Sequence, residues 1–316
     1  MDNLTHSLVG AALGRAGLYR RTRLAAGALI IGANLPDIDV IGLPFGENLA
    51  FRRGITHGPL AMLLLPLLLT GALVVWGRVR APRSTTADDN ELRPRQLLLL
   101  SYVGVLTHPF FDWLNSYGVR LLYPFSDRWF YGDSIFIIDL WVWIALGTGV
   151  WIARRRSKQQ HPDAERPARI SLAGVAAYVL LMIAGSAYAR EYARQQASAQ
   201  GTAVVDVMAA PVPLNPFVRS IVIETSSAYQ LGRVAFFPSI SFSTGVEIAR
   251  NAVNASAQRA VASGAFDDFL YWSRFPYFTV TVRGDSADVK IGDARFPGSG
   301  AVSNSFSLTA TVPATK

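Results

Sequence analysis

The feature that most restricts this chain is Gly58–Trp76, a run of 19 residues without a single charge. A helix of about 20 apolar residues is the length that crosses a hydrocarbon core about 30 Å thick. The composition agrees, because 51% of the residues are hydrophobic and only 16% are charged, against about 25% charged in soluble domains. We therefore predict a membrane protein, and the same numbers exclude a disordered chain.

Further apolar segments predict a helical bundle with several spans. Residues 96–113, 134–153 and 170–189 are apolar over similar lengths. Residues 4–35 contain two shorter apolar stretches on either side of the basic Tyr19–Arg23, which predicts a short helical hairpin. Because these charges follow the first apolar stretch, we do not expect a cleaved signal peptide. The predicted fold of residues 1–195 is an α-helical polytopic membrane bundle that carries the functional site.

The positions of Lys and Arg predict the orientation of this bundle. They cluster in Arg15–Arg23, Arg78–Arg95 and Arg154–Arg169, which are alternate connections of a six-segment chain. The positive-inside rule makes these connections cytoplasmic, and it places both termini on the outer side of an inner (cytoplasmic) membrane. The net charge of +8 is then mostly a topology signal. Few aromatic residues interleave with the arginines, so no nucleic-acid partner is expected.

After Arg190 the hydrophobic pattern changes from long apolar runs to alternation, which is typical of strands. We predict an extracytoplasmic α+β domain over residues 196–316. It contains no histidine, so we expect it to shape access to the site or to contact a partner. The expected elements are strands at Arg219–Glu224, Gly232–Phe237 and Phe278–Arg283, a helix within Val246–Ser263, a hairpin turn at Gly284–Asp285 and a last strand at Phe306–Val312.

Histidine and aspartate side chains gather at the predicted outer face of the bundle. The sides of the membrane follow from Lys and Arg alone, so this sorting is an independent observation. An ionisable side chain costs about 2.5–3.5 kcal/mol near the centre of a membrane and less at its interface, and it usually marks function. The residues are His6, His57 and His108, each preceded by threonine, together with Asp37, Asp39, Asp112 and Asp139.

Spacing within this group indicates a metal site. His108 and Asp112 are four residues apart, so they share a helix face, provided that Pro109 lies in the first turn. Asp37 and Asp39 flank one residue and would point the same way in an extended turn. Without cysteine, imidazole and carboxylate ligands suit zinc first and manganese second. One or two ions are expected, with predicted ligands His6, Asp37, Asp39, His57, His108 and Asp112.

Simpler roles exist for the same residues. A single interfacial histidine is usually a hydrogen-bonded cap or a headgroup contact, and Asp37 or Asp39 would also serve as a helix N-cap. Asp139 has the alternative of pairing with Arg52 or Arg128. The metal hypothesis is favoured because several such residues gather at one face.

The motifs resemble a known family over roughly residues 1–151. They look like the YdjM-like family of inner-membrane metal-dependent hydrolases and are similar, more distantly, to zinc-dependent phospholipase C. The resemblance implies a hydrolase and places the six predicted ligands on the motif positions. The motifs are Met1–Gly10, Ala33–Val40, Arg52–Gly58, Thr107–Gly118, Tyr123–Ser126 and Phe136–Asp139.

The functional hypothesis is a hydrolase that acts at the outer membrane face on a phosphoester or other ester of a lipid or envelope substrate. Asp39 or Asp139 would act as general base, and Arg52 and Arg53 would hold a phosphate. One alternative is a non-catalytic protein with a structural metal, whose carboxyl-terminal domain binds a partner. A transporter is a weaker alternative, because transport sites usually lie near the membrane midplane. The sequence gives no expectation for the oligomeric state.

Overall fold

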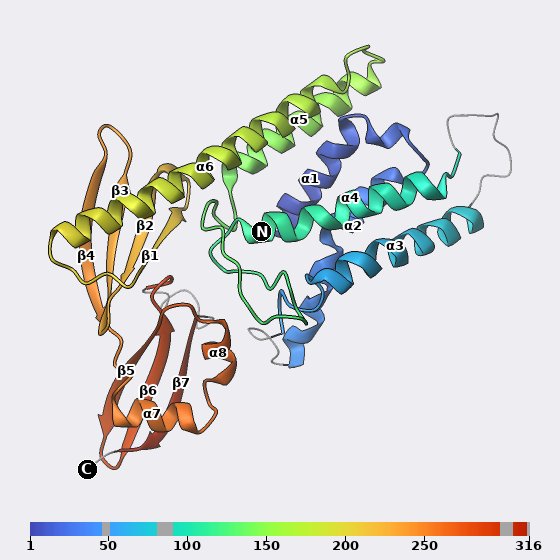
Figure 1. The fold of residues 1–316 in the computed structure, drawn as a ribbon. Helices are drawn as coiled ribbons and strands as arrows, with labels where there is room; N and C mark the ends of the chain where they lie inside the picture. Colours follow the sequence, from blue (N-terminus) through green and yellow to red (C-terminus); the bar gives the residue numbers. More distant parts are fainter. Residues whose placement is uncertain (46–50, 81–90, 298–305, 315–316) are drawn as a thin grey trace. The chain divides into compact units, whose positions relative to one another are not determined.

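A computed structural model of the chain describes residues 1–45, 51–80, 91–297 and 306–314. The chain divides into two compact units, Met1–Ala184 and Gly185–Lys316. Helices make up the first unit and strands dominate the second (Figure 1). The predicted combination of a helical amino-terminal part with a carboxyl-terminal β-sheet domain is therefore confirmed.

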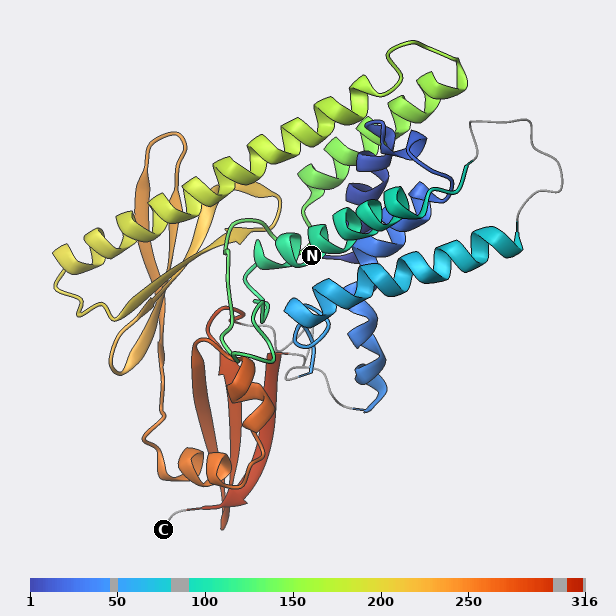
Figure 2. The same ribbon diagram turned by 45° about the vertical axis from the view of Figure 1, so that its right-hand side comes forward.

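The first unit is built from helices that run back and forth (Figures 1 and 2). Glycines let its central helices approach closely. A Cβ added at Gly10 would lie 2.7 Å from the Leu29 carbonyl oxygen, and one added at Gly104 would lie 2.8 Å from that of Ala28. Such contacts between small residues are common among membrane helices. The elements are α1 (Asn3–Arg15), η1 (Leu18–Arg20), α2 (Ala25–Asn34), η2 (Leu35–Phe45), α3 (Pro59–Val79), α4 (Pro94–Trp113), α5 (Leu140–Lys158) and α6 (Arg166–Ala199).

Three helical segments are long and apolar enough to cross a membrane: Ala25–Gly42, Pro59–Val79 and Arg166–Ala199. The last two contain the predicted spans at 58–76 and 170–189. Among the described residues, α4 and α5 do not reach the same measure, although they cover most of the predicted spans at 96–113 and 134–153. The number of crossings and their direction stay predictions.

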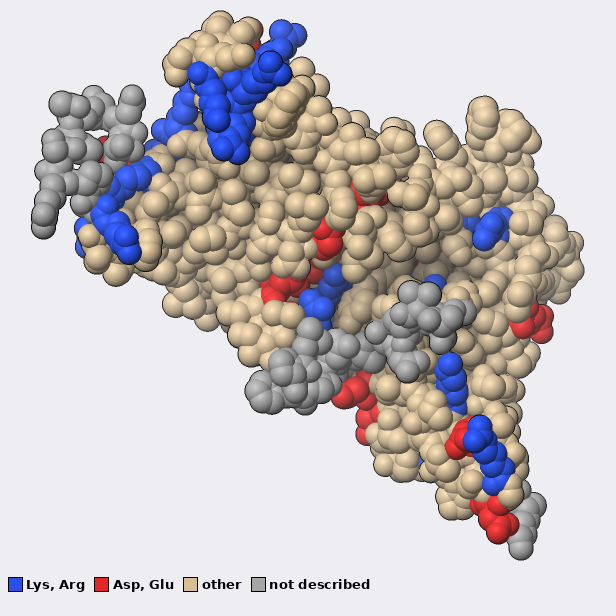
Figure 3. Space-filling view, turned by 180° about the vertical axis from the view of Figure 1, so that it is seen from behind, with Lys and Arg blue, Asp and Glu red and all other residues tan. Residues whose placement is uncertain are grey.

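The basic connections of the first unit meet one another. The Arg20 side chain pairs with Glu165 at 3.0 Å, and Arg169 donates a hydrogen bond to the Ala16 carbonyl oxygen at 2.9 Å. The Arg23 amide donates to the Glu91 carbonyl oxygen at 3.1 Å. Lys and Arg side chains accordingly gather at one end of the helices in Figure 3. We call this the basic end.

Two antiparallel sheets form the second unit. The order of the first is β1-β2-β3-β4, and the order of the second is β5-β6-β7. The last turns of α6 cover the first sheet, where Ala189, Ala193 and Ala197 pack in one core with Val207 and Ile221. The elements are β1 (Asp206–Val212), β2 (Asn215–Glu224), β3 (Ala228–Ala235), β4 (Ser241–Ala249), α7 (Ala255–Ala262), α8 (Asp267–Trp272), β5 (Pro276–Arg283), β6 (Ser286–Asp293) and β7 (Ser307–Pro313).

The predicted elements of this unit hold, with one correction. Strands occupy most of each expected range, and Gly284–Asp285 is the two-residue turn between β5 and β6, where Arg283 pairs with Ser286. The helix expected within Val246–Ser263 is wrong for its first residues, because β4 extends to Ala249. The helix starts only at Ala255, where the Asn254 side chain accepts hydrogen bonds from the first-turn amides.

Candidate metal centre

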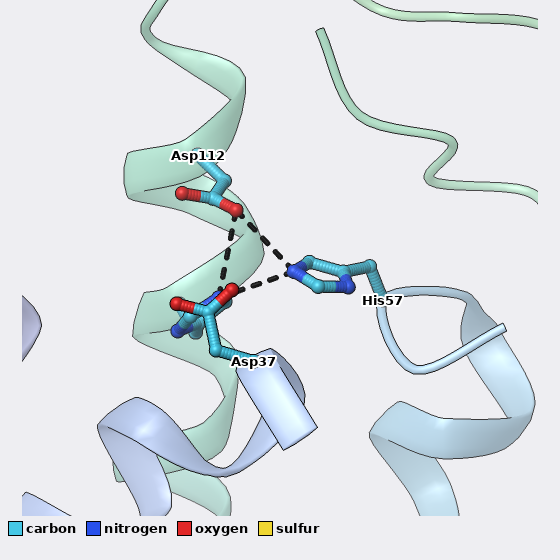
Figure 4. Close-up of side chains that lie close together, drawn as sticks. Asp37, His57 and Asp112 are labelled. Atoms are coloured by element: carbon cyan, nitrogen blue, oxygen red, sulfur yellow. Dashed lines mark hydrogen bonds and ion pairs between the residues drawn. The ribbon is translucent and has the colours of Figure 1, made fainter. Parts of the chain in front are cut away.

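Four side chains from three parts of the first unit converge in its interior. Asp37 lies in η2, His57 precedes α3, and His108 and Asp112 lie on α4. Each offers one ligand atom, and these atoms all lie within 4.8 Å of one another. The three labelled side chains point toward a common centre in Figure 4. All four residues are buried, so their charges are shielded from water. We call these four residues the quartet.

His108 and Asp112 share one face of α4, as predicted, but Pro109 does not lie where that prediction required it. His108 Nε2 lies 3.5 Å from Asp112 Oδ2, as expected for residues four apart on a helix. The condition on Pro109 is wrong, because Pro109 lies inside α4 near its carboxyl-terminal end. The ring removes one helical hydrogen bond there. The helix nevertheless continues, and the Thr107 hydroxyl donates to the Gly104 carbonyl oxygen at 2.6 Å.

Asp37 and Asp39 do not lie in an extended turn, which corrects that expectation. They belong to η2, a 3-10 segment, and their carboxylates share Arg52 but lie beside different histidines. Asp37 Oδ1 lies 3.7 Å from His108 Nε2. Asp39 Oδ2 accepts the Arg53 amide at 2.8 Å and lies 3.7 Å from His57 Nδ1. Asp39 thus stands behind His57, outside the quartet.

Hydrogen bonds at the outer ring nitrogens assign the tautomers of the two histidines. His108 Nδ1 lies 2.7 Å from the Ala33 carbonyl oxygen, which only accepts, so this nitrogen carries the proton. His57 Nδ1 lies 2.9 Å from the Thr56 hydroxyl and faces Asp39. Burial holds the pKa of His57 below its ordinary value, although the hydrogen bond to Asp112 opposes this. With its proton on Nδ1, each neutral ring would offer its Nε2 atom to an ion.

The two Nε2 atoms face one another at 3.1 Å, and Asp112 Oδ2 lies 3.3 Å from that of His57. The Arg53 guanidinium approaches the same carboxylate oxygen at 3.1 Å. The atoms that meet at this centre are all of the kinds that ligate a cation. Two imidazole nitrogens and two carboxylates fit a divalent ion such as zinc or manganese.

His6, a predicted ligand, adjoins the quartet. Its ring stacks on His108 with centroids 3.9 Å apart, and Nε2 lies 3.3 Å from Asp112 Oδ1. Neither ring nitrogen makes a hydrogen bond. The Met1 amino group also contacts Asp112 Oδ1. Asp112 therefore faces the quartet with one oxygen and His6 with the other.

The two arginines differ in exposure. Arg53 is buried, and its Nε pairs with Asp112 Oδ2 at 3.1 Å. Its Nη1 donates to Asn115 Oδ1 at 3.1 Å. Arg52 is 27% exposed and contacts Asp37 Oδ1 at 3.2 Å and Asp39 Oδ1 at 3.5 Å. Arg53 thus neutralises Asp112 in the interior of the unit, whereas Arg52 reaches the surface.

Asp139 is not brought to the quartet. Its Oδ1 accepts the amides of Trp141 and Val142 at 3.0 and 3.1 Å, which makes it the N-cap of α5. The Tyr178 hydroxyl donates to its Oδ2 at 3.0 Å. Sequence reasoning did not foresee the Ala33 carbonyl or the role of Asn115 beside Arg53. Asn115 lies just beyond the end of α4 at Trp113, where helical spacing does not predict the direction of its side chain.

Comparisons with known proteins place these residues in a matched region. The model of the family described as "YdjM inner membrane protein" matches residues 1–192, which include every predicted site residue. The uncharacterized protein YfhP of Bacillus subtilis (strain 168) is 26% identical over 168 residues. That alignment covers 48% of this chain and 47% of YfhP, so the chain spans about half the length of this relative. No solved structure matches.

Proposed function

The chain belongs to the YdjM inner membrane protein family, and we propose that it is a membrane-bound, metal-dependent hydrolase. The proposed substrate is a phosphoester or other ester of a lipid or envelope molecule, reached from the outer membrane face. The observation that carries the proposal is the pair of Nε2 atoms 3.1 Å apart between two buried carboxylates. These are the ligand types that hold a divalent ion.

The quartet would hold the ion. A divalent ion supplies a Lewis acid that polarises the scissile ester and lowers the pKa of water toward about 7. The chain supplies orientation, because the Ala33 carbonyl fixes the His108 ring and Asp39 with Thr56 fixes the His57 ring. Such outer contacts typically set metal affinity by factors of about 10–100.

Asp39 and Arg52 are the proposed groups for the reaction itself. Asp39 Oδ2 accepts the Arg53 amide, whereas its Oδ1 accepts no hydrogen bond and lies 3.5 Å from Arg52 Nε. This second oxygen suits a general base that takes a proton from water. Arg52 is partly exposed and already binds two carboxylates, so its guanidinium suits a substrate phosphate. Asp139, the other predicted base, has one oxygen engaged at the start of α5 and the other by Tyr178 of α6.

The test is a screen of lipid phosphoesters and carboxylic esters with detergent-purified protein loaded with zinc or manganese. Asp39→Asn should lower kcat by about 10²–10⁴, the typical contribution of a general base. Arg52→Gln should act mainly on KM. His161→Ala is the matched control, because His161 is exposed in the basic connection. Turnover that is unchanged in Asp39→Asn would overturn the assignment.

A second function is favoured by one observation, the burial of the quartet, in which His108 and Asp112 are 0% exposed. Four protein ligands that close around an ion are typical of structural zinc sites. In that case the metal would stabilise the bundle and the carboxyl-terminal domain would bind a partner. Stoichiometric metal with no turnover on any ester in the screen would support this second function.

A further inference from the structure

A groove runs between α5 and α6, and none of its lining residues belongs to the quartet. Its volume is about 600 Å³, within the range of pockets that hold small ligands. Ile144, Ile152, Ile170 and Gly174 are among its apolar lining residues, and Arg156 and Arg166 line it as well. Ile144 and Ile170 are 51% and 60% exposed, so the groove opens to the surroundings. We call it the α5–α6 groove.

The lining follows a regular pattern on both helices. On α5 the stripe Ile144, Thr148, Ile152 and Arg156 repeats every four residues, and on α6 Arg166, Ile170 and Gly174 do the same. Residues four apart share a helix face. Because a short connection joins the end of α5 to the start of α6, Arg156 and Arg166 stand at the same end of the groove. That end is the basic end of the unit.

The two arginines carry charge that nothing described nearby neutralises. Neither makes an ion pair among the residues that the structure describes, whereas Glu165 beside them is engaged by Arg20 and Arg169. Arg154, Arg155 and Lys158 add further positive charge to the same end. An occupant of the groove therefore meets an apolar stripe along its length and a cationic pair at one end.

We propose that the α5–α6 groove binds an anionic phospholipid, with an acyl chain along the apolar stripe and the phosphate between Arg156 and Arg166. Guanidinium groups bind phosphate through two parallel hydrogen bonds. Basic pockets between membrane helices bind anionic headgroups by this chemistry. The arginine pair favours a charged headgroup, because an uncharged lipid would gain only the apolar contacts. The inference does not depend on hydrolase activity.

The test is native mass spectrometry of the full chain, purified in detergent and mixed with phosphatidylglycerol or phosphatidylcholine. The wild type should retain phosphatidylglycerol in preference. Arg156→Gln/Arg166→Gln should lower that retention by roughly tenfold. The control Arg154→Gln/Arg155→Gln removes the same charge outside the groove lining and should change retention less than about twofold.

A second pair of variants tests the apolar stripe. A Cβ added at Gly174 or at Gly147 meets no atom within 4 Å, so both helices accept a larger residue there. Gly174→Leu should block the groove and lower retention, whereas Gly147→Leu, outside the lining, should not. Equal losses in both arginine doubles, equal retention of the two lipids, or full retention in Gly174→Leu would each overturn the proposal.

Discussion

Both units of this protein bury charged side chains, and they satisfy them in opposite ways. In the β unit, Asp293 accepts hydrogen bonds from the Ser273 hydroxyl at 2.6 Å, the Arg274 amide at 2.9 Å and the Arg295 guanidinium at 2.9 Å. Arg295 in turn stacks over Trp272 at 4.4 Å. In the helical unit, two imidazoles and two carboxylates meet at one centre, with Arg53 beside Asp112 and Arg52 beside Asp37.

The difference separates a structural role from a ligand-binding one. A buried carboxylate whose donors come from its own chain is complete as it stands. Imidazole and carboxylate groups from three segments that converge on one point have the arrangement of a site for a cation. Burial and charge alone would not distinguish the structural site at Asp293 from the ligand-binding site at the quartet. The predictions below act on this difference.

The largest effect is expected for Asp112→Ala. It removes a ligand and leaves the Arg53 guanidinium buried without its partner, which typically costs about 3–5 kcal/mol. Unfolding of purified protein, followed by circular dichroism, would measure this loss, and elemental analysis would measure the loss of metal. Asp163→Ala, at an exposed position in the basic connection, is the control. A stability within about 0.5 kcal/mol of the wild type would contradict the account.

Asp293→Asn should destabilise the β unit alone. The substitution weakens charge-assisted hydrogen bonds worth about 1.5–3 kcal/mol but leaves the quartet intact. Hydrogen exchange of the full chain should accelerate in peptides from β5, β6 and β7, with metal content unchanged. Asp285→Asn, in the exposed turn before β6, is the matched substitution and should leave exchange as it is. Loss of metal in Asp293→Asn would erase the distinction between the units.

Asp39→Asn should lower metal affinity by about 10–100-fold, because the carboxylate that orients His57 is lost. Asp139→Asn alters the cap of α5 and should leave metal affinity unchanged. Titration of the metal-free proteins with zinc would compare the two variants. Equal affinities in both would show that Asp39 does not support His57.

In the β unit, a pH effect should appear only at low pH. Burial alone would raise the pKa of Asp293, but Arg295 and Ser273 outweigh it and hold the pKa below its ordinary value. The stabilisation is therefore complete above the unfolded pKa of about 3.9 and is lost as the pH falls through the folded pKa. The protection of β6 amides against hydrogen exchange, relative to the intrinsic rate at each pH, should fall only below about pH 4. A loss of protection between pH 5 and 7 would contradict this assignment.

Residue spacing predicted part of the fold and of the site. Periodicity placed the helices and most strands, and the four-residue spacing of His108 and Asp112 predicted one face. It did not predict the direction of Asp37 and Asp39, because a 3-10 turn and an extended turn place side chains differently. Nor did the spacing predict that Asp39 lies outside the quartet or that Asp139 caps α5, because those roles depend on contacts between distant segments.

The most direct test of the central claim is the metal content of detergent-purified protein, measured by elemental analysis. The account predicts about one or two equivalents of zinc or manganese in the wild type. It predicts their loss in a folded His57→Ala/His108→Ala variant and their retention in His161→Ala. Absence of metal from the wild type, even after reconstitution with both ions, would contradict the account and leave the quartet a hydrogen-bonded network around a proton.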